Sequence, residues 1–259
     1  MLLLTKGINF VNNISVTSYD FIYTLNIFYY KQGFPMKLLT KLKLHLIFIM
    51  ILTTCISAQK QTITRGNYTL NFESKTAAYD SVLYNRLIET FFEVYPILAD
   101  RFNPQTEDTV TFIVDPNFDG VAATGNAVTI FNAKWFEKFP GDIDVVTHEV
   151  MHIIQAYPHE AGPWWVTEGI ADYVRNKYGV DNEGAKWSMP EVKQEHSYDN
   201  SYRITARFFT WLENNIDSTI ISKLDGIMRR GEYNDEVWEK LTGKSVSRLW
   251  EDYKKNPQL

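Results

Sequence analysis

The chain has 259 residues, of which 45% are hydrophobic, 22% charged and 15% aromatic. Such a chain can bury one substantial core, and its sequence has no repeat or low-complexity tract that would indicate a solenoid or a disordered array. Residues 59–259 hold 21 basic and 30 acidic residues, a net charge of −9. We therefore expect no nucleic-acid partner, since phosphates attract clusters of Lys and Arg.

Residues 36–58 are typical of a secretory signal peptide. Lysines follow Met36, an apolar run extends over Leu44–Leu52, and small residues precede Gln59. An uncleaved anchor is the weaker alternative, because the apolar run is short for a bilayer. We therefore expect a secreted or periplasmic protein with no stable membrane association after signal cleavage.

Residues 1–35 match neither a signal nor a domain. They contain aromatic residues without a clear period, and we interpret them as an extension upstream of a true start at Met36. Cys55, the only cysteine, follows a poor match to a lipoprotein cleavage site, so lipid anchoring is less favoured than secretion. The cysteine-free remainder must depend on packing for its stability.

The remainder, residues 59–259, is expected to form a single domain with strands first and helices later. Short strands are predicted within 62–74, at 109–114 and at 127–131. Helical spacing and breaker residues predict helices over 80–102, 142–157, 165–177, 201–215, 219–230, 234–241 and 246–253. Pro96 is expected to kink or end the first helix. This order indicates an α+β fold rather than a doubly wound sheet.

The sequence His148-Glu149-Val150-Met151-His152 lies on the predicted helix over 142–157. Two histidines four residues apart share one helical face, with Cβ atoms about 5–6 Å apart, which suits two imidazoles on one tetrahedral zinc ion. Glu149 flanks the same face and can take a proton from a zinc-bound water. The pattern predicts a catalytic zinc ion with Glu149 as general base.

A catalytic zinc ion needs a third protein ligand. Glu168 follows His152 by sixteen residues, and a loop of that length can return a second helix that presents Glu168 to the metal. Asp172, one turn later, can accept a hydrogen bond from the second nitrogen of a ligand histidine. Small residues at Gly169 and Ala171 permit two helices to approach closely. Asp172 itself and His159 stay open as alternative third ligands.

Three further segments carry a family resemblance together with the histidine motif. They are Glu168-Gly169-Ile170-Ala171-Asp172-Tyr173-Val174-Arg175, Tyr202-Arg203-Ile204-Thr205-Ala206-Arg207-Phe208 and Leu249-Trp250-Glu251-Asp252-Tyr253. With them, the chain from about Thr62 to Tyr253 resembles the plant basic secretory protein family of peptidases, found in plants and bacteria.

The resemblance implies a zincin-like metallopeptidase fold, in which a small N-terminal mixed sheet with an edge strand precedes a mostly helical half. It also implies secretion and zinc-dependent peptide hydrolysis of the gluzincin type. The sequence pI is about 5.6, so no role that depends on positive charge transfers from the family. Its substrate preference does not transfer either.

Peptide hydrolysis needs a donor to the oxyanion that forms when water attacks the carbonyl. Tyr202 is our candidate and His196 a weaker one, with surface or packing roles as the alternative for both. Arg203 and Arg207 fit either a substrate carboxylate or, as we favour, ion pairs with surface acids.

Ala127, Val128 and Thr129 precede the metal helix, as residues of an edge strand lining a cleft would. Peptides commonly bind such an edge as an added strand, so we expect these residues to contact the substrate. The glycine-spaced segment 120–125 and the loop at Gly162-Pro163 are expected to shape the cleft.

The sequence thus predicts a secreted, monomeric zinc metallopeptidase with one catalytic Zn²⁺ and a peptide or protein substrate. One alternative is a non-catalytic zinc-containing binding module of the same fold. Another is a membrane-tethered scaffold held by residues 42–58. Glu149 argues against the first alternative, because a binding module needs no general base.

Overall fold

The computed structural model describes residues 59–76 and 80–259. The predictions for residues 1–58, namely the upstream extension, the signal peptide and the alternative at Cys55, lie outside the described residues. Among the described residues no helix is both long and apolar enough to cross a membrane. Residues 58–259 form one compact unit.

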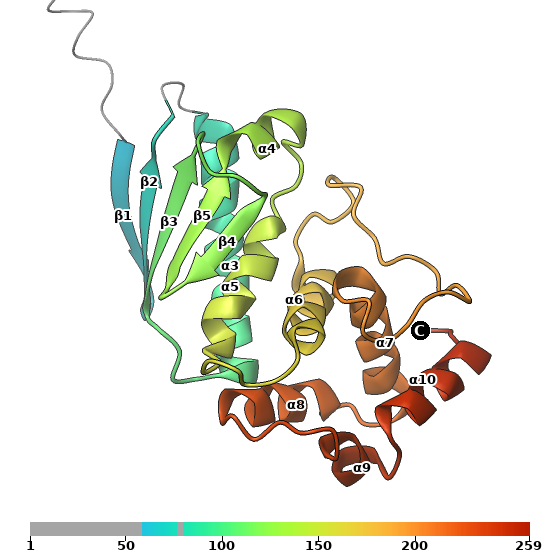
Figure 1. Cartoon of the computed structure of the whole chain (residues 1–259). Coiled ribbons are helices and arrows are strands. Elements are labelled where there is room, and N and C mark those ends of the chain that lie inside the picture. Colours follow the sequence, from blue (N-terminus) through green and yellow to red (C-terminus); the bar gives the residue numbers. More distant parts are fainter. Residues whose placement is uncertain (1–58, 77–79) are drawn as a thin grey trace, which may run out of the picture. The chain divides into compact units, whose positions relative to one another are not determined.

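A five-stranded mixed sheet forms the first layer of this unit (Figure 1). Its spatial order is β1-β2-β3-β5-β4, with antiparallel pairs at both ends and parallel pairs of β2 with β3 and of β3 with β5. The strands are β1 (Gln59–Arg65), β2 (Tyr68–Ser74), β3 (Thr109–Asp115), β4 (Ala122–Gly125) and β5 (Val128–Asn132). Alternate residues of β2 and β3 are buried, so one face of the sheet packs against the core.

Helix α3 (Ser81–Phe102) packs on that face through aromatic residues. The ring of Phe91 meets the ring of Phe112 on β3 edge-on, at a centroid distance of 5.5 Å. Phe112 meets Phe131 on β5 in the same way at 5.0 Å. Pro96 lies inside α3, which continues to Phe102, so the prediction that it could end the helix is wrong. The fully buried residues on both sides of Pro96 hold this helix on the sheet, and that packing outweighs the lost backbone hydrogen bond.

The edge strand differs from the one predicted. We expected residues 127–131 to form the edge, but β5 lies between β3 and β4 and is paired on both sides. The edge strand on this side of the sheet is β4, within the glycine-spaced segment that carried no strand prediction. β4 is only four residues long and two of them are alanines, so it lacks the β-branched run by which β5 was recognised.

Helices make up the second half of the chain (Figure 1). They are α4 (Ala133–Lys138), α5 (Val145–Gln155), α6 (Trp164–Tyr178), α7 (Tyr202–Asn215), α8 (Ile220–Arg229), α9 (Val237–Thr242) and α10 (Val246–Lys255). All of these except α4 were predicted, with ends that differ by up to three residues. Strands come first and helices later, so the predicted α+β fold, with a small mixed sheet, an edge strand and a mostly helical second half, is confirmed.

Gly169 lies where α6 approaches α7 closely. A Cβ atom on Gly169 would lie 2.3 Å from Thr205 Cγ2 and 3.1 Å from the ring of Phe209. Both neighbours belong to α7, so the small residue permits α6 to approach α7. That contact sets the position of the N-terminus of α7 beside α6.

Candidate metal centre

Helix α5 carries the histidine motif and is held by its apolar face. Val146 and Val150 are fully buried, while His148 and His152 face the opposite way with only part of each side chain exposed. The helix starts at Val145, three residues later than predicted, and its N-cap residue is Asp144. Its carboxylate accepts hydrogen bonds from the backbone N–H groups of Val180 and Asp181. Ala156 ends the helix in the left-handed conformation, with φ of 43°.

Three nitrogen and oxygen atoms converge beside α5. His148 Nε2 lies 3.3 Å from His152 Nε2 and 3.3 Å from Glu168 Oε2. Glu168 Oε2 lies 3.7 Å from His152 Nε2. Ligand atoms about 2.0–2.1 Å from a tetrahedral zinc ion are themselves about 3.3 Å apart. The donor set and its spacing therefore fit a zinc ion, with Glu168 contributed by α6.

Each histidine uses its other ring nitrogen on a fixed partner. His148 Nδ1 lies 2.7 Å from Asp172 Oδ1, and His152 Nδ1 lies 2.7 Å from Gln155 Oε1. The amide nitrogen of Gln155 donates in turn to the carbonyl of Thr167, at 2.9 Å. Such partners fix the ring orientation and leave both Nε2 atoms free for a metal ion.

Asp172 and His159, the alternative third ligands, lie differently from Glu168. The Asp172 carboxylate contacts the far nitrogen of His148, away from the Nε2 atoms. The His159 side chain is 92% exposed and lies beside Glu160. Among the described residues, the group of side chains that can hold one metal ion consists of His148, His152 and Glu168. This arrangement favours Glu168 as the third ligand.

The carboxylates around His148 control its protonation. Burial alone would lower the pKa of His148, but hydrogen bonds to Asp172 and Glu168 outweigh it and raise that pKa to about 10. Burial would raise the pKa of Glu168, yet its contacts with both histidines hold it below its usual range. A metal ion at this position would compete with a proton for His148.

Glu149 lies on the same side of α5 and is oriented from the sheet. It is buried, with 8% of its surface exposed, and its Oε2 accepts a hydrogen bond of 2.7 Å from the Thr124 hydroxyl. Thr124 belongs to the edge strand β4, and its hydroxyl is also 2.9 Å from that of Thr129. Because Thr124 donates to Glu149, Thr129 must donate to Thr124.

Tyr202 lies at the start of α7, and its side chain lies beside His148. Its ring lies nearly parallel to that of His148, with a centroid distance of 6.2 Å, and meets Trp164 edge-on. Tyr202 and Ser201 both have positive φ angles, 47° and 66°, which turn the chain into α7 beside the histidines. Burial and the carboxylates of Glu168, Asp172 and Glu149 raise the pKa of Tyr202, so its hydroxyl stays protonated.

A cleft of about 1360 Å³ runs past these residues. Ala127 lines it together with the whole of β4, whereas Val128 and Thr129 do not line it and Thr129 is fully buried. His196 is not among the lining residues either, and its ring accepts a hydrogen bond from the backbone of Lys193. Gly162 and Pro163 are likewise absent from the cleft wall.

The two arginines of α7 have different environments. Arg207 donates to the Tyr253 hydroxyl and to the Pro257 carbonyl, so it ties α7 to the C-terminal segment. Arg203 lines the cleft and donates to the Ser188 carbonyl at 3.3 Å. Neither forms an ion pair within the described part of the chain, whereas we favoured pairing with surface acids for both.

Two residues of the centre were missed from the sequence. Gln155 sits three residues after His152, a spacing that places it on the same face, and that spacing was the available signal. Thr124 gave no signal, because its role depends on β4 being the edge strand that faces α5.

The edge strand β4 of a mixed sheet and two helices, which bring two histidines and a glutamate together, define a candidate mononuclear metal centre at the wall of a cleft. The chain belongs to the family described as peptidase of plants and bacteria, whose pattern matches residues 58–253. This is the family that the sequence resemblance implied.

Two solved structures are similar to part of this chain. One is an aminopeptidase N family protein from Idiomarina loihiensis, with a TM-score of 0.47, 11% identity, and coverage of 76% of this chain and 46% of that one. Another is an M1 zinc metallopeptidase from Deinococcus radiodurans, with a TM-score of 0.38, 12% identity, and coverage of 78% and 48%. The chain thus spans about half the length of these proteins. A comparison with curated proteins finds no match.

Proposed function

We propose that this peptidase is a secreted zinc metallopeptidase, with His148, His152 and Glu168 as ligands of one catalytic Zn²⁺. The spacing of 3.3–3.7 Å among the three donor atoms, with Glu149 buried beside them, carries this proposal. Secretion rests on the signal-like pattern of residues 36–58.

The proposed chemistry assigns one task to each side chain. When bound, zinc lowers the pKa of a water molecule to near 7 and polarises the substrate carbonyl. Glu149 takes a proton from the attacking water and passes it to the leaving amine. Thr124 holds one Glu149 oxygen through its 2.7 Å hydrogen bond and leaves the other oxygen for proton transfer. The protonated Tyr202 hydroxyl donates to the oxyanion.

The substrate is proposed to bind along β4, as an added strand. Asn132 N–H bonds to the Val121 carbonyl across the β4–β5 pair. In an antiparallel pair the backbone groups of alternate residues turn inward, so those of Ala122 and Thr124 point to the free edge. A peptide bound along that edge would lie beside Glu149, because the Thr124 hydroxyl on the same strand donates to the Glu149 carboxylate.

The test is metal analysis combined with peptide cleavage on the wild type and on Glu149→Gln. We expect about one zinc per chain in both proteins, with kcat lowered by about 10²–10⁴-fold in the variant, because general acid–base catalysis contributes that much. Glu160→Gln is the matched control, since Glu160 is exposed and outside the cleft. It should retain full activity.

The possible results separate the alternatives. Zinc in both proteins with equal cleavage would remove Glu149 from the role of base. Zinc without cleavage by the wild type would favour the non-catalytic binding module. Absence of zinc from the wild type would overturn the metal centre itself.

A further inference from the structure

Outside the metal centre, three charged side chains of the cleft wall have no ion-pair partner among the described residues. Those that line the cleft, apart from the metal centre itself, are Glu107, Asp142, Arg175, Lys186 and Arg203. Arg175 and Asp142 are both buried and form an ion pair, so they balance each other. What remains is one carboxylate, Glu107, and two cations, Lys186 and Arg203.

The two cations lie at the same end of the cleft. Arg203 donates to the carbonyl of Ser188, next to Trp187, and Lys186 is the other neighbour of Trp187. The Arg175 guanidinium lies 4.8 Å from the centre of the Trp187 ring. Its partner Asp142 accepts a hydrogen bond from the Trp135 indole at 2.8 Å. Lys186 and Arg203 therefore belong to the end formed by α4 and the start of α5.

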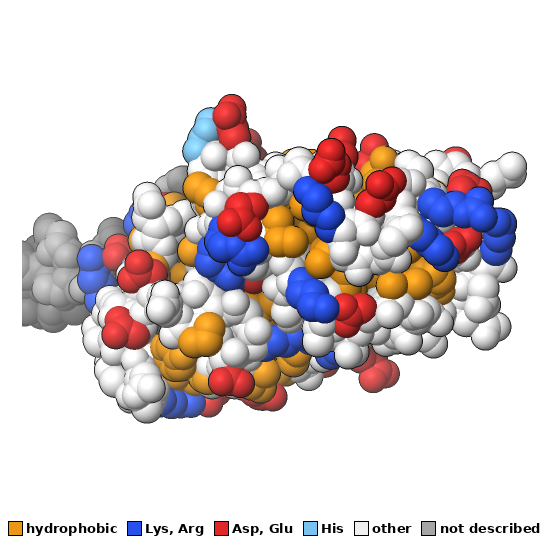
Figure 2. Space-filling model, turned by 90° about the horizontal axis from the view of Figure 1, so that it is seen from below, with side chains coloured by type: hydrophobic (Ala, Val, Ile, Leu, Met, Phe, Trp, Pro, Cys, Tyr) orange, Lys and Arg blue, Asp and Glu red, His pale blue; other side chains and the backbone are white. Residues whose placement is uncertain are grey.

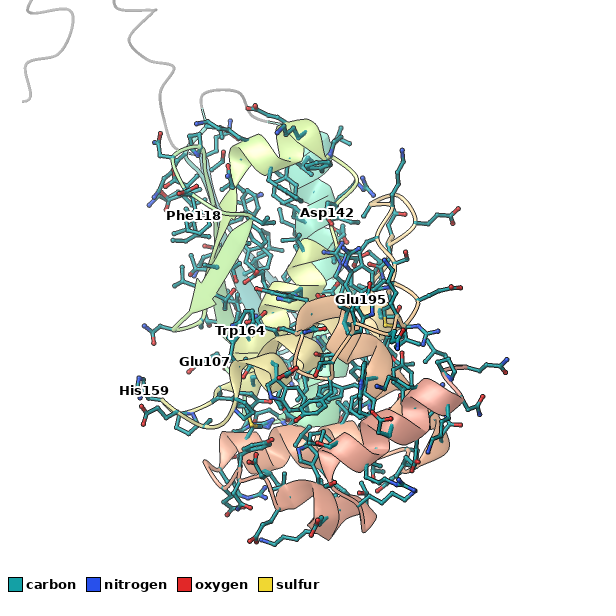
Figure 3. The ribbon with its side chains drawn as sticks, turned by 45° about the vertical axis from the view of Figure 1, so that its right-hand side comes forward. Glu107, Phe118, Asp142, His159, Trp164 and Glu195 are labelled. Atoms are coloured by element: carbon teal, nitrogen blue, oxygen red, sulfur yellow. The ribbon has the colours of Figure 1, made fainter. Side chains whose placement is uncertain are left out.

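Glu107 lies at the opposite end. Its neighbour Thr106 contacts the carbonyl of Ile153 in the last turn of α5. Figure 3 labels Glu107 near the lower end of α5 and Asp142 near its upper end. The cleft thus has a carboxylate at one end and two cations at the other, with the metal centre between them.

The loop that carries Lys186 is fixed in place. The Asp144 carboxylate accepts hydrogen bonds from Val180 and Asp181, and Asn182 donates to the Arg175 carbonyl. Lys186 itself has a φ of 53°, a left-handed conformation that a lysine adopts only where its surroundings impose it. Within the described residues, neither Lys186 nor Arg203 forms an ion pair. Both charges are open to a ligand, although the chain carries an excess of acids.

The direction of β4 relates this charge pattern to the substrate. A peptide added antiparallel to β4 runs in the same direction as β5, from Val128 towards Asn132. β5 leads directly into α4, which carries Trp135. The C-terminal part of such a peptide therefore lies at the end with Lys186 and Arg203.

We propose that Lys186 and Arg203 bind a carboxylate on the C-terminal side of the cleaved bond. That carboxylate is either an acidic side chain of the substrate or its C-terminal group. A guanidinium with an ammonium beside it suits a carboxylate, because Arg offers paired N–H donors and Lys adds a point charge. The proposal rests on the peptidase function proposed above and names the substrate class of that same site.

The test compares internally quenched peptides that differ only in one residue, Glu, Gln or Lys, placed one to three positions after the cleaved bond. A second pair differs only in ending with a free acid or an amide. We expect kcat/KM for the wild type to favour the Glu peptide over the Lys peptide, or the acid over the amide, by about three- to tenfold. The preference should weaken in high salt.

The variant Lys186→Glu/Arg203→Glu should reverse the preferred charge while it retains zinc. Lys193→Glu, which changes an exposed lysine outside the cleft, is the control and should keep the wild-type preference. A Glu-over-Gln preference assigns the site to acidic side chains, and an acid-over-amide preference assigns it to the C-terminus.

Cleavage by the wild type with no preference in either series would overturn this proposal alone. An unaltered preference in the double variant would also overturn it. Failure of the zinc-loaded wild type to cleave any peptide would instead overturn the proposed function. In that case, the charge preference can still be tested by measuring, with fluorescence anisotropy, how tightly the same peptides bind to Glu149→Gln. Equal affinities there would overturn the carboxylate site.

Discussion

His148 and His152 each present one ring nitrogen to Glu168 and the other to an acceptor of their own. Asp172 comes from α6, whereas Gln155 comes from the same helix as His152. Gln155 is 1% exposed and also bonds to Thr167, so it connects the second histidine to the start of α6. In the proposed zinc site, Gln155 is therefore a positioning residue that would act on the metal through His152.

Replacing Gln155 with leucine tests that role. Leucine keeps the bulk but leaves His152 Nδ1 without an acceptor, so we expect zinc affinity to fall by about 10–100-fold. Competition with a chromophoric chelator measures the affinity, and near-UV circular dichroism monitors folding. Gln194→Leu, at an exposed position, is the control. Equal affinity in Gln155→Leu and the wild type would show that His152 needs no such partner.

At the residue scale, sequence spacing was enough to predict the side chains that lie on a single helix face. His148, Glu149 and His152 share one face of α5, and Glu168 and Asp172 share one face of α6, where the structure brings them to the same place. Thr124 and Gln155 were not predicted. The contact of Thr124 depends on how the edge strand β4 packs beside α5, 25 residues further along the chain, and that of Gln155 depends on the rotamer of a polar side chain.

At the scale of elements, β4 and β5 show that a local sequence pattern can predict a strand without predicting its neighbours in the sheet. The β-branched residues of β5 predicted a strand, and the strand exists. The predicted place of β5 at the edge of the sheet was wrong, because the order of strands in a sheet depends on which strands pair and not on their order along the chain. The four residues of β4 became the edge by folding back on β5 through Asn126 and Ala127, both with positive φ.

Proline at position 122 tests β4 as the substrate strand. Ala122 N–H points to the free edge, so Ala122→Pro removes a donor to the peptide without removing a β4–β5 hydrogen bond. We expect kcat/KM to fall by about 2–10-fold, the value of one hydrogen bond, with zinc content unchanged.

Ala123→Pro provides the comparison for that variant. Alternation in an antiparallel pair points Ala123 N–H towards β5, so proline there should lower the thermal stability as well as the activity. Unchanged cleavage by Ala122→Pro would argue that peptides bind elsewhere in the cleft.

At the scale of the whole molecule, one ion network joins the sheet-packed helix α3 to the helical half. Glu213 on α7 accepts from Arg101 on α3 and from Lys177 on α6, both at 2.6 Å. Burial would raise the pKa of Glu213, but hydrogen bonds from Lys177, Tyr173 and Arg101 hold it below its usual 4.5. Ionised Glu213 therefore stabilises the fold above about pH 4.5, and this contribution is lost as the pH falls through the lowered pKa.

Glu213→Gln should lower the free energy of unfolding at pH 7 by about 1.5–3 kcal/mol, the cost of hydrogen bonds to a charged group. Urea unfolding at several pH values measures the difference from the wild type. The difference should be constant at neutral pH and shrink as the pH falls below about 4.5. Glu251→Gln on the exposed side of α10 is the control. A difference that does not change with pH would mean that Glu213 contributes through packing alone.

The charge balance of the whole chain was available from the sequence, but its distribution was not. Figure 2 shows acidic and basic side chains interspersed over the face viewed there. The excess of acids gave no reason to expect two unpaired cations at one end of the cleft. They lie together because Asp144 binds the loop before Lys186 and because α7 starts beside α6, contacts between residues far apart in sequence.

The short free edge of β4 has a consequence for which proteins can be cut. It lies inside a cleft whose other wall includes α6 and α7, so a segment that binds there must be extended and must leave its own backbone partners. If the proposed function and substrate strand hold, a folded protein becomes a substrate only through local unfolding of several residues, and its cleavage rate follows the free energy of that opening. Selectivity among intact proteins would then depend as much on their local stability as on the sequence around the cut.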